Sequence, residues 1–158
     1  MSTEAFDTNA GLEDAVLRLL ARCEHRLRIF DPDLTVGPMA DRRATECLEQ
    51  MMHRSPKAEC TLLLHDTSHI AIACPRLLDL YRRRGHQFRV LQTAAEHRQY
   101  LQPFVIGDRR DLATRFHADH LRGKLCLDEP IELAGFEQRF EQLEERAVPA
   151  AGLDGLCL

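Results

Sequence analysis

Polar side chains that could bind or activate a ligand follow three apolar runs of the sequence, at 27–30, 60–64 and 88–91. These side chains are Asp31, Asp33, His65, Asp66, Gln92, Glu96 and His97. Carboxylates and imidazoles can act as general acids and bases or bind a ligand by hydrogen bonds. A later polar segment adds groups of the same kinds, namely Arg115, His117, Asp119 and His120. If the three runs are parallel strands, their carboxyl ends meet in one crevice, where open α/β sheets bind their ligands.

Each of these groups also has a structural explanation. Asp31 and Asp33 flank Pro32 and can cap a turn. His65 and His69 have a spacing that would bind a metal on a helix. However, His65 ends a predicted strand, and the motif His-Glu-x-x-His is absent. We therefore expect turn-forming roles for these two histidines and no bound metal.

The segment 116–120 could chelate a metal or present a base, although it is also typical of a polar loop. We expect neither a catalytic residue nor a cofactor. The ligand-binding candidates that remain are Asp31, Asp33, His65, Asp66, His97, Arg115 and His117.

The elements that would position these residues alternate along the chain. Apolar residues at helical spacing precede each of the three runs, which gives α-β-α-β-α-β as far as Leu91. Three more short strands are expected at 104–106, 112–116 and 124–127, with a hairpin turn at 107–110. A last helix begins near Pro130 and ends before Pro149.

This order predicts an α/β fold, a three-layer α/β/α sandwich with a mixed, mainly parallel sheet. We expect a single domain at 9–147, with flexible tails at 1–8 and 148–158. The chain has 158 residues, of which 44% are hydrophobic, enough for one domain with a core.

The composition argues against several classes of protein. No apolar run approaches the ~20 residues that cross a bilayer, and the polar N-terminus does not resemble a signal peptide, so we expect a cytoplasmic protein. None of the six cysteines forms a Cys-x-x-Cys pair, which favours reduced core thiols. There is no Gly-rich phosphate loop and no Gly-x-Ser-x-Gly motif.

The net charge of −4 is spread unevenly. Residues 76–122 contain ten arginines and five acids, whereas residues 128–158 contain eight acids and two arginines. A basic face of this kind can attract an anionic ligand, but a solvated basic surface is the simpler interpretation. Nucleic-acid binding is a weaker alternative, because only 6% of the residues are aromatic and none is Trp.

One stretch carries a resemblance to a known family. Leu101-x-Pro103, followed by four residues and Asp108, has the register of the motif His-x-Lys-x-x-x-x-Asp of the phospholipase D-like superfamily. The downstream run from Lys124 to Pro130 is similar to that family's closing strand. Phe136, Phe140 and Leu143 then resemble its last helix.

The resemblance implies a phospholipase D-like half-domain without its usual chemistry. In active members the His attacks phosphorus and the Lys holds phosphate oxygens. Leu101 and Pro103 can do neither, and covalent catalysis fails without its nucleophile. The chain is thus similar to uncharacterised bacterial members that lack the catalytic motif.

These expectations lead to a non-catalytic module that binds a ligand or another protein. The partners implied are a second copy in a homodimer, an acetyltransferase-type protein or a small anionic ligand. Two alternatives stay open: a hydrolase or transferase on a phosphate-containing substrate that uses relocated histidines, and a weak nucleic-acid binder.

Overall fold

The computed structural model describes residues 1–153. Its first half comprises β1 (Ser2–Phe6), α1 (Asn9–Arg22), β2 (Arg26–Asp31), α2 (Arg42–Arg54), β3 (Glu59–Leu64), α3 (Ser68–Ala73), α4 (Pro75–Arg83) and β4 (Phe88–Gln92). Its second half comprises the 3₁₀ turn η1 (Ala95–His97), β5 (Phe104–Gly107), β6 (Asp111–Arg115), β7 (Gly123–Leu127), α5 (Pro130–Glu145) and β8 (Val148–Pro149). The predicted strands and the last helix therefore lie within a residue or two of their expected places.

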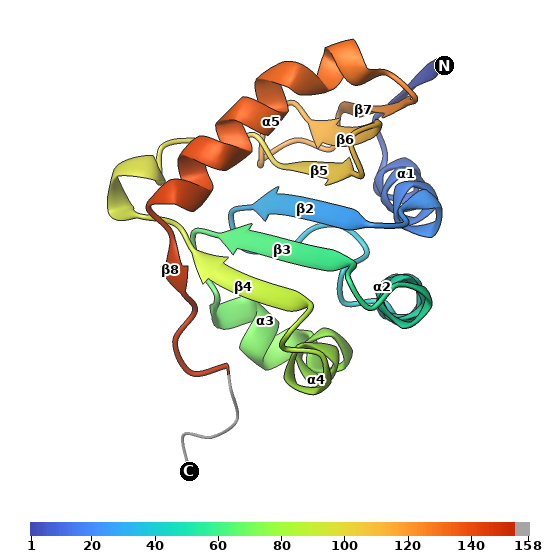
Figure 1. Ribbon diagram of the computed structural model, residues 1–158. Coiled ribbons are helices and arrows are strands. Elements are labelled where there is room, and N and C mark those ends of the chain that lie inside the picture. The colour runs from blue at the N-terminus through green and yellow to red at the C-terminus, as the bar shows by residue number, and fades with distance from the viewer. Residues whose placement is uncertain (154–158) are drawn as a thin grey trace.

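The strands form one mixed sheet in the order β1-β7-β6-β5-β2-β3-β4-β8 (Figure 1). Only β2, β3 and β4 are parallel, and the other five pairings between described strands are antiparallel. The expected parallel character is thus limited to the βαβ units at the centre. The β5–β6–β7 meander is antiparallel because its links are too short for a crossover.

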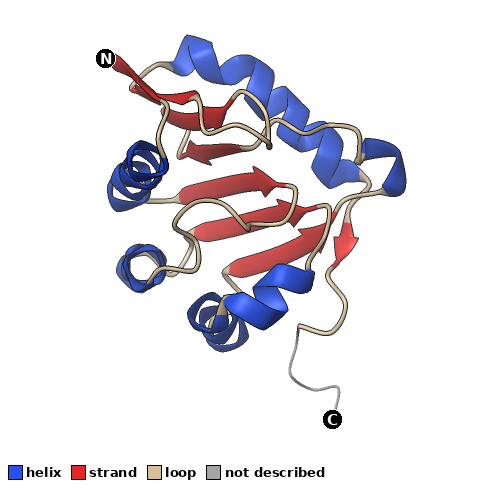
Figure 2. Ribbon diagram, turned by 180° about the vertical axis from the view of Figure 1, so that it is seen from behind, coloured by secondary structure: helices blue, strands red, loops and turns tan. Residues whose placement is uncertain are grey.

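Helices cover both faces of the sheet, as expected for a three-layer sandwich. Figure 2 shows α1, α2 and α4 on one side of the strands and the long α5 on the other. Helices α1, α2 and α4 share a core with alternate strand residues such as Ile29 and Leu62. On the opposite face, Phe140 of α5 packs with Phe30 and Phe104. Strand residues buried on both faces explain why the run 60–64 is almost continuously apolar.

The N-terminal segment is not the flexible tail that its polar sequence suggests. Ser2–Phe6 pairs with β7 along its whole length, in register from Ser2–Leu127 to Phe6–Gly123. The Phe6 side chain packs where a Cβ on Gly123 would lie 2.6 Å from its ring and 2.0 Å from the Thr114 carbonyl oxygen. Only glycine at position 123 therefore allows the Phe6 ring and the Thr114 backbone to approach β7 this closely.

The segment after α5 also differs from the expected tail. Val148–Pro149 forms β8 beside β4, and the Ala150 N–H donates to the Val90 carbonyl at 3.0 Å. Leu153 is buried. The rest of the expected tail, 154–158, lies outside the described residues. No helix in the described part of the chain is long and apolar enough to cross a membrane.

Candidate functional site

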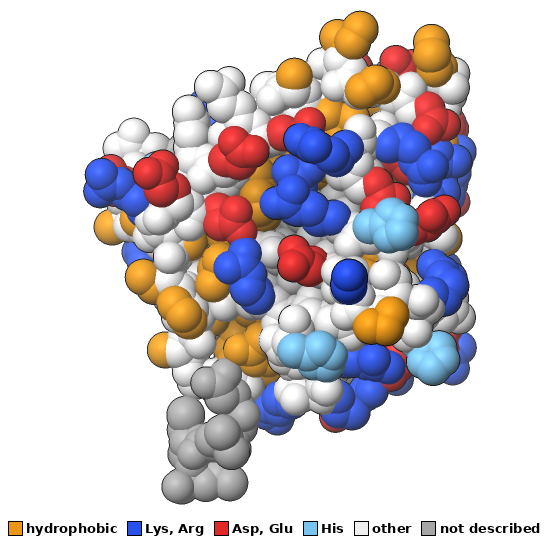
Figure 3. Space-filling model, in the orientation of Figure 1, with side chains coloured by type: hydrophobic (Ala, Val, Ile, Leu, Met, Phe, Trp, Pro, Cys, Tyr) orange, Lys and Arg blue, Asp and Glu red, His pale blue; other side chains and the backbone are white. Residues whose placement is uncertain are grey.

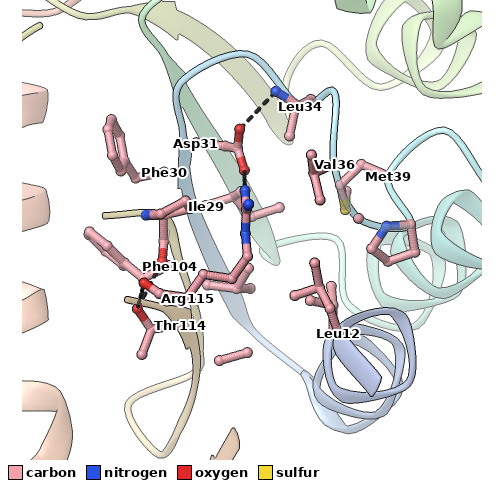
Figure 4. A pocket seen from close by; sticks show the side chains of 16 residues that line it. Leu12, Ile29, Phe30, Asp31, Leu34, Val36, Met39, Phe104, Thr114 and Arg115 are labelled. Atoms are coloured by element: carbon pink, nitrogen blue, oxygen red, sulfur yellow. Dashed lines mark hydrogen bonds and ion pairs between the residues drawn. The ribbon is translucent and has the colours of Figure 1, made fainter. Parts of the chain in front are cut away.

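A buried ion pair joins the carboxyl ends of two strands. Asp31 ends β2 and Arg115 ends β6, and Arg115 Nη2 lies 3.4 Å from Asp31 Oδ2 (Figure 4). Both residues are almost completely buried. Arg115 Nη1 donates to the carbonyls of Ala118 at 2.8 Å and His120 at 3.4 Å. The guanidinium is therefore neutralised and largely satisfied within the protein.

The other oxygen of Asp31 shapes the loop that follows β2. Asp31 Oδ1 accepts hydrogen bonds from the backbone N–H groups of Leu34 at 2.8 Å and Asp33 at 3.1 Å. Burial raises the pKa of the Asp31 carboxyl, against the opposing effects of these two N–H groups and of Arg115. Leu34 is held in the left-handed region with φ of 67°, which is uncommon for a residue with a side chain.

The ion pair lines both a groove and a smaller cavity beside it. The groove has a volume of about 430 Å³, and Leu101 and Asp119 line its rim beside Asp31 and Arg115. The cavity has a volume of about 40 Å³, and its walls are mostly apolar. Figure 4 shows the Arg115 side chain lying between Phe30 and Phe104 on one side and Val36 and Met39 on the other. The arginine thus fills the middle of the site.

The two altered motif positions lie at this site. Leu101 lines the groove and Pro103 lines the cavity. The Leu101 carbonyl also accepts a hydrogen bond from the Ala118 N–H at 2.9 Å, which ties it to the loop after β6. The place where the resemblance expects a nucleophile and a phosphate-holding cation therefore presents a leucine, a proline and an arginine that is already paired.

Asp108, the one motif position that keeps its residue type, lies at the opposite end of the sheet. Its carboxylate accepts hydrogen bonds from the backbone N–H groups of Glu24, His25 and Arg26 at the start of β2. Burial raises the pKa of Asp108, but these N–H groups outweigh burial and hold the pKa below its ordinary value. Asp108 therefore has a structural role at the start of β2.

His65 is buried and uses both ring nitrogens inside the protein. Its Nε2 lies 2.7 Å from the Tyr100 carbonyl, and its Nδ1 contacts the Thr93 hydroxyl. Because a carbonyl can only accept, Nε2 carries a proton, and a neutral ring then accepts from Thr93 at Nδ1. His65 thus anchors the segment that carries Leu101. It does not line the groove.

Three other predicted residues cap turns or lie apart from the groove. Asp66 is exposed and accepts from the Ser68 N–H at 2.9 Å, as a helix cap does. His97 is half-buried, and its Nδ1 has no hydrogen-bond partner among the described residues. His117 Nδ1 accepts from the Asp119 N–H at 3.0 Å. None of these three residues lines the groove.

The structure therefore brings together Asp31, Asp33 and Arg115 from the predicted set, along with Asp119. Asp33 also accepts hydrogen bonds from the Thr35 N–H and hydroxyl. This is the turn-capping role that the sequence offers as an alternative to ligand binding. Three carboxylates and one paired guanidinium give the groove a net negative charge. This charge does not favour the small anionic ligand expected from the sequence.

Solved structures of other proteins share the fold of this chain. Nuc from Salmonella typhimurium, a phospholipase D family member, superposes with a TM-score of 0.71 at 11% identity, over 94% of this chain and 97% of Nuc. NucT from Helicobacter pylori gives a TM-score of 0.62 at 12% identity, over 94% and 99% of the two chains. The chain has the phospholipase D-like fold.

A third structure with this fold is TrmBL2, an archaeal chromatin protein with a novel mode of DNA binding. It superposes with a TM-score of 0.68 at 10% identity over 95% of this chain, which spans 54% of the TrmBL2 chain. No curated protein sequence matches this chain. Residues 8–156 match the family described as "Domain of unknown function (DUF7931)", and the chain belongs to that family.

Proposed function

We propose that this chain is a non-catalytic phospholipase D-like domain that acts as a ligand-binding or protein-interaction module. One observation carries the proposal: the side chains at the motif site are Leu101, Pro103 and an Arg115 engaged by Asp31. Leu101 has no lone pair to attack phosphorus. Arg115 is only 5% exposed and is bound to a carboxylate and two carbonyls, so it offers little to a phosphate.

The relocated-histidine alternative has little support at this site. None of the described histidines lines the groove or the cavity. His117 and His120 lie close, with ring centroids 5.7 Å apart, but they belong to the loop beside the groove. His65 is committed to Thr93 and Tyr100.

Nucleic-acid binding is also poorly supported by the arginines. Several of those expected to form a basic face are ion-paired: Arg83 with Glu49 and Asp79, Arg89 with Glu144, and Arg109 with Glu137. Figure 3 shows positive and negative side chains mixed over the face that carries α5. A surface that binds along a nucleic-acid backbone needs positive side chains along its whole length.

The decisive experiment is a phosphodiesterase assay on the purified chain with bis(p-nitrophenyl) phosphate, phosphatidylcholine vesicles and single-stranded DNA. We expect no turnover that tracks with the protein through purification. Turnover that is lost in Asp119→Ala or His117→Gln, two residues outside the core, would overturn the proposal. The homodimer and the acetyltransferase-type partner remain predictions, and co-elution experiments can test both.

A further inference from the structure

A second groove lies at the other end of the sheet, and three of its seven lining residues are arginines. It has a volume of about 680 Å³ and is lined by Ala21, Arg22, Glu24, His25, Arg54, Ser55 and Arg110. The groove lies where α1 and α2 end and where the β5–β6 hairpin turns. We call it the arginine groove.

A buried carboxylate fixes the first of these arginines. Asp111 is 1% exposed and accepts from Arg22 Nε at 2.9 Å and from Arg22 Nη2 at 3.3 Å. Arg22 Nη2 also lies 3.1 Å from Asp128 Oδ2. Its Nη1 makes no hydrogen bond with the described residues, so two N–H donors on a rigidly held fork remain unused.

Arg110 is held against Arg22 from the hairpin turn. Its Nη2 donates to the Arg22 carbonyl at 3.1 Å. Its Nε is buried without a hydrogen-bond partner, although Asp128 Oδ1 lies 3.5 Å and Asp111 Oδ2 lies 3.7 Å away. This Nε is therefore ion-paired and out of reach of a ligand, whereas Arg110 Nη1 makes no hydrogen bond with the described residues.

Arg54 completes the groove from the end of α2. It is exposed and forms no hydrogen bond or ion pair with the described residues. Its place in the last turn suits the helix dipole, which explains a cation there without any ligand. The dipole does not account for the unused donors of Arg22 and Arg110, which are held by Asp111 and by a carbonyl.

We propose that the arginine groove binds the phosphate group of a small phosphorylated molecule. The Nη1 groups of Arg22 and Arg110 and the whole guanidinium of Arg54 are free to donate, and several donors suit the several oxygens of a phosphate dianion better than they suit a single carboxylate. The volume is in the range of small-molecule sites and larger than one phosphate needs. Glu24 is the one carboxylate that lines the groove, whereas Asp111 and Asp128 hold its arginines from outside the lining.

The groove does not fit a nucleic-acid duplex. Its three arginines surround one hollow, whereas duplex binding uses cations spaced along many phosphates. The site also lies at the end of the sheet opposite the Asp31–Arg115 pair. The phosphate-binding proposal does not depend on the function proposed above, and each can fail without the other.

The test is a titration of the ¹⁵N-labelled chain with sodium phosphate at low ionic strength, followed by backbone amide shifts. We expect saturable shifts at Arg22, Arg54 and Arg110, with a dissociation constant on the order of 1 mM. Arg54→Ala should weaken binding about tenfold, because it removes one charge-assisted contact. Arg54→Lys keeps the charge and should weaken binding less. Arg76→Ala is the matched control, because Arg76 is also exposed and unpaired among the described residues.

Three results would overturn the proposal. They are an absence of saturable shifts, equal weakening by Arg54→Ala and Arg76→Ala, and tighter binding of a 12-base-pair duplex than of a nucleoside monophosphate at the same salt concentration. Arg54→Ala breaks no contact between described residues, so its effect does not depend on a loss of folding.

Discussion

Arg115 Nη2 lies 3.4 Å from Asp31 Oδ2, although the two residues are 84 positions apart in the chain. Their side chains are 5% and 11% exposed. The pair closes the carboxyl ends of β2 and β6 over an apolar cavity. A carboxylate and a guanidinium that are buried together keep each other charged, so each residue depends on the other for its place in the core.

This dependence predicts a strong coupling between the two side chains. Arg115→Met leaves Asp31 buried without its cation and should lower the free energy of unfolding by about 3 kcal/mol. Asp31→Asn in the same chain removes the stranded charge, so the double variant should be more stable than Arg115→Met alone. Urea denaturation of the four proteins measures the coupling. Additive effects would show that the two charges do not interact.

A pH-dependent contribution to stability is expected from Asp108. Its pKa is lowered in the folded protein, so its stabilising effect is present above the unfolded pKa of about 3.9 and is lost as the pH falls through the folded pKa. Asp108→Asn should cost about 1–3 kcal/mol at pH 7 and less at pH 3. Asn tolerates the positive φ of 55° at this position, so the backbone is not strained.

Denaturation of both proteins at the two pH values checks this prediction. A difference that is the same at pH 7 and pH 3 would contradict it, since the charge would then contribute nothing.

The different surroundings of two glycines predict opposite effects of an alanine substitution on stability. In Gly123→Ala the new Cβ would lie 2.0 Å from a backbone oxygen, and the strands must separate, which should cost more than about 2 kcal/mol. In Gly135→Ala the new Cβ meets nothing within 4 Å on a helix, and the change should stabilise the protein by roughly 0.5–1 kcal/mol. Thermal unfolding of both variants is the measurement, and two shifts of the same sign would argue against the close packing of Gly123 on Thr114 of β6 and Phe6 of β1.

Restoring the motif should not restore catalysis. Leu101→His/Pro103→Lys supplies the two missing residue types, but the Arg115 side chain still fills the space between groove and cavity. We expect no hydrolysis of bis(p-nitrophenyl) phosphate, because a nucleophile out of position gains little. Hydrolysis by this variant that Leu101→Gln/Pro103→Lys does not share would contradict the prediction.

The sequence predicts the interior of the fold better than its edges. The runs 60–64 and 104–106 are buried on both faces and largely apolar, so composition alone marks them as strands. Ser2–Phe6 is an edge strand whose first four residues are exposed, and no apolar alternation marks it. Its pairing depends on β7, more than a hundred residues later, which local patterns cannot report.

The candidate site was only partly predictable for a similar reason. The strand-end rule correctly brings Asp31 and Arg115 together. What it misses is that their remaining partners are backbone groups, such as the carbonyl of Ala118 and the N–H of Leu34. Every residue carries these groups, so the sequence does not show which polar side chains are already satisfied. His65 was wrongly placed among the ligand-binding candidates for the same reason, because its partner is the backbone carbonyl of Tyr100.

The first and last strands, β1 and β8, form the two opposite edges of the sheet. Eight strands span seven spacings of about 4.8 Å each, which separates the two edges by roughly 30 Å. A circular permutation that joins residue 2 to residue 149 would need a linker of at least about ten extended residues. Dyes placed at those two positions would measure the width of the sheet and report when either edge strand detaches.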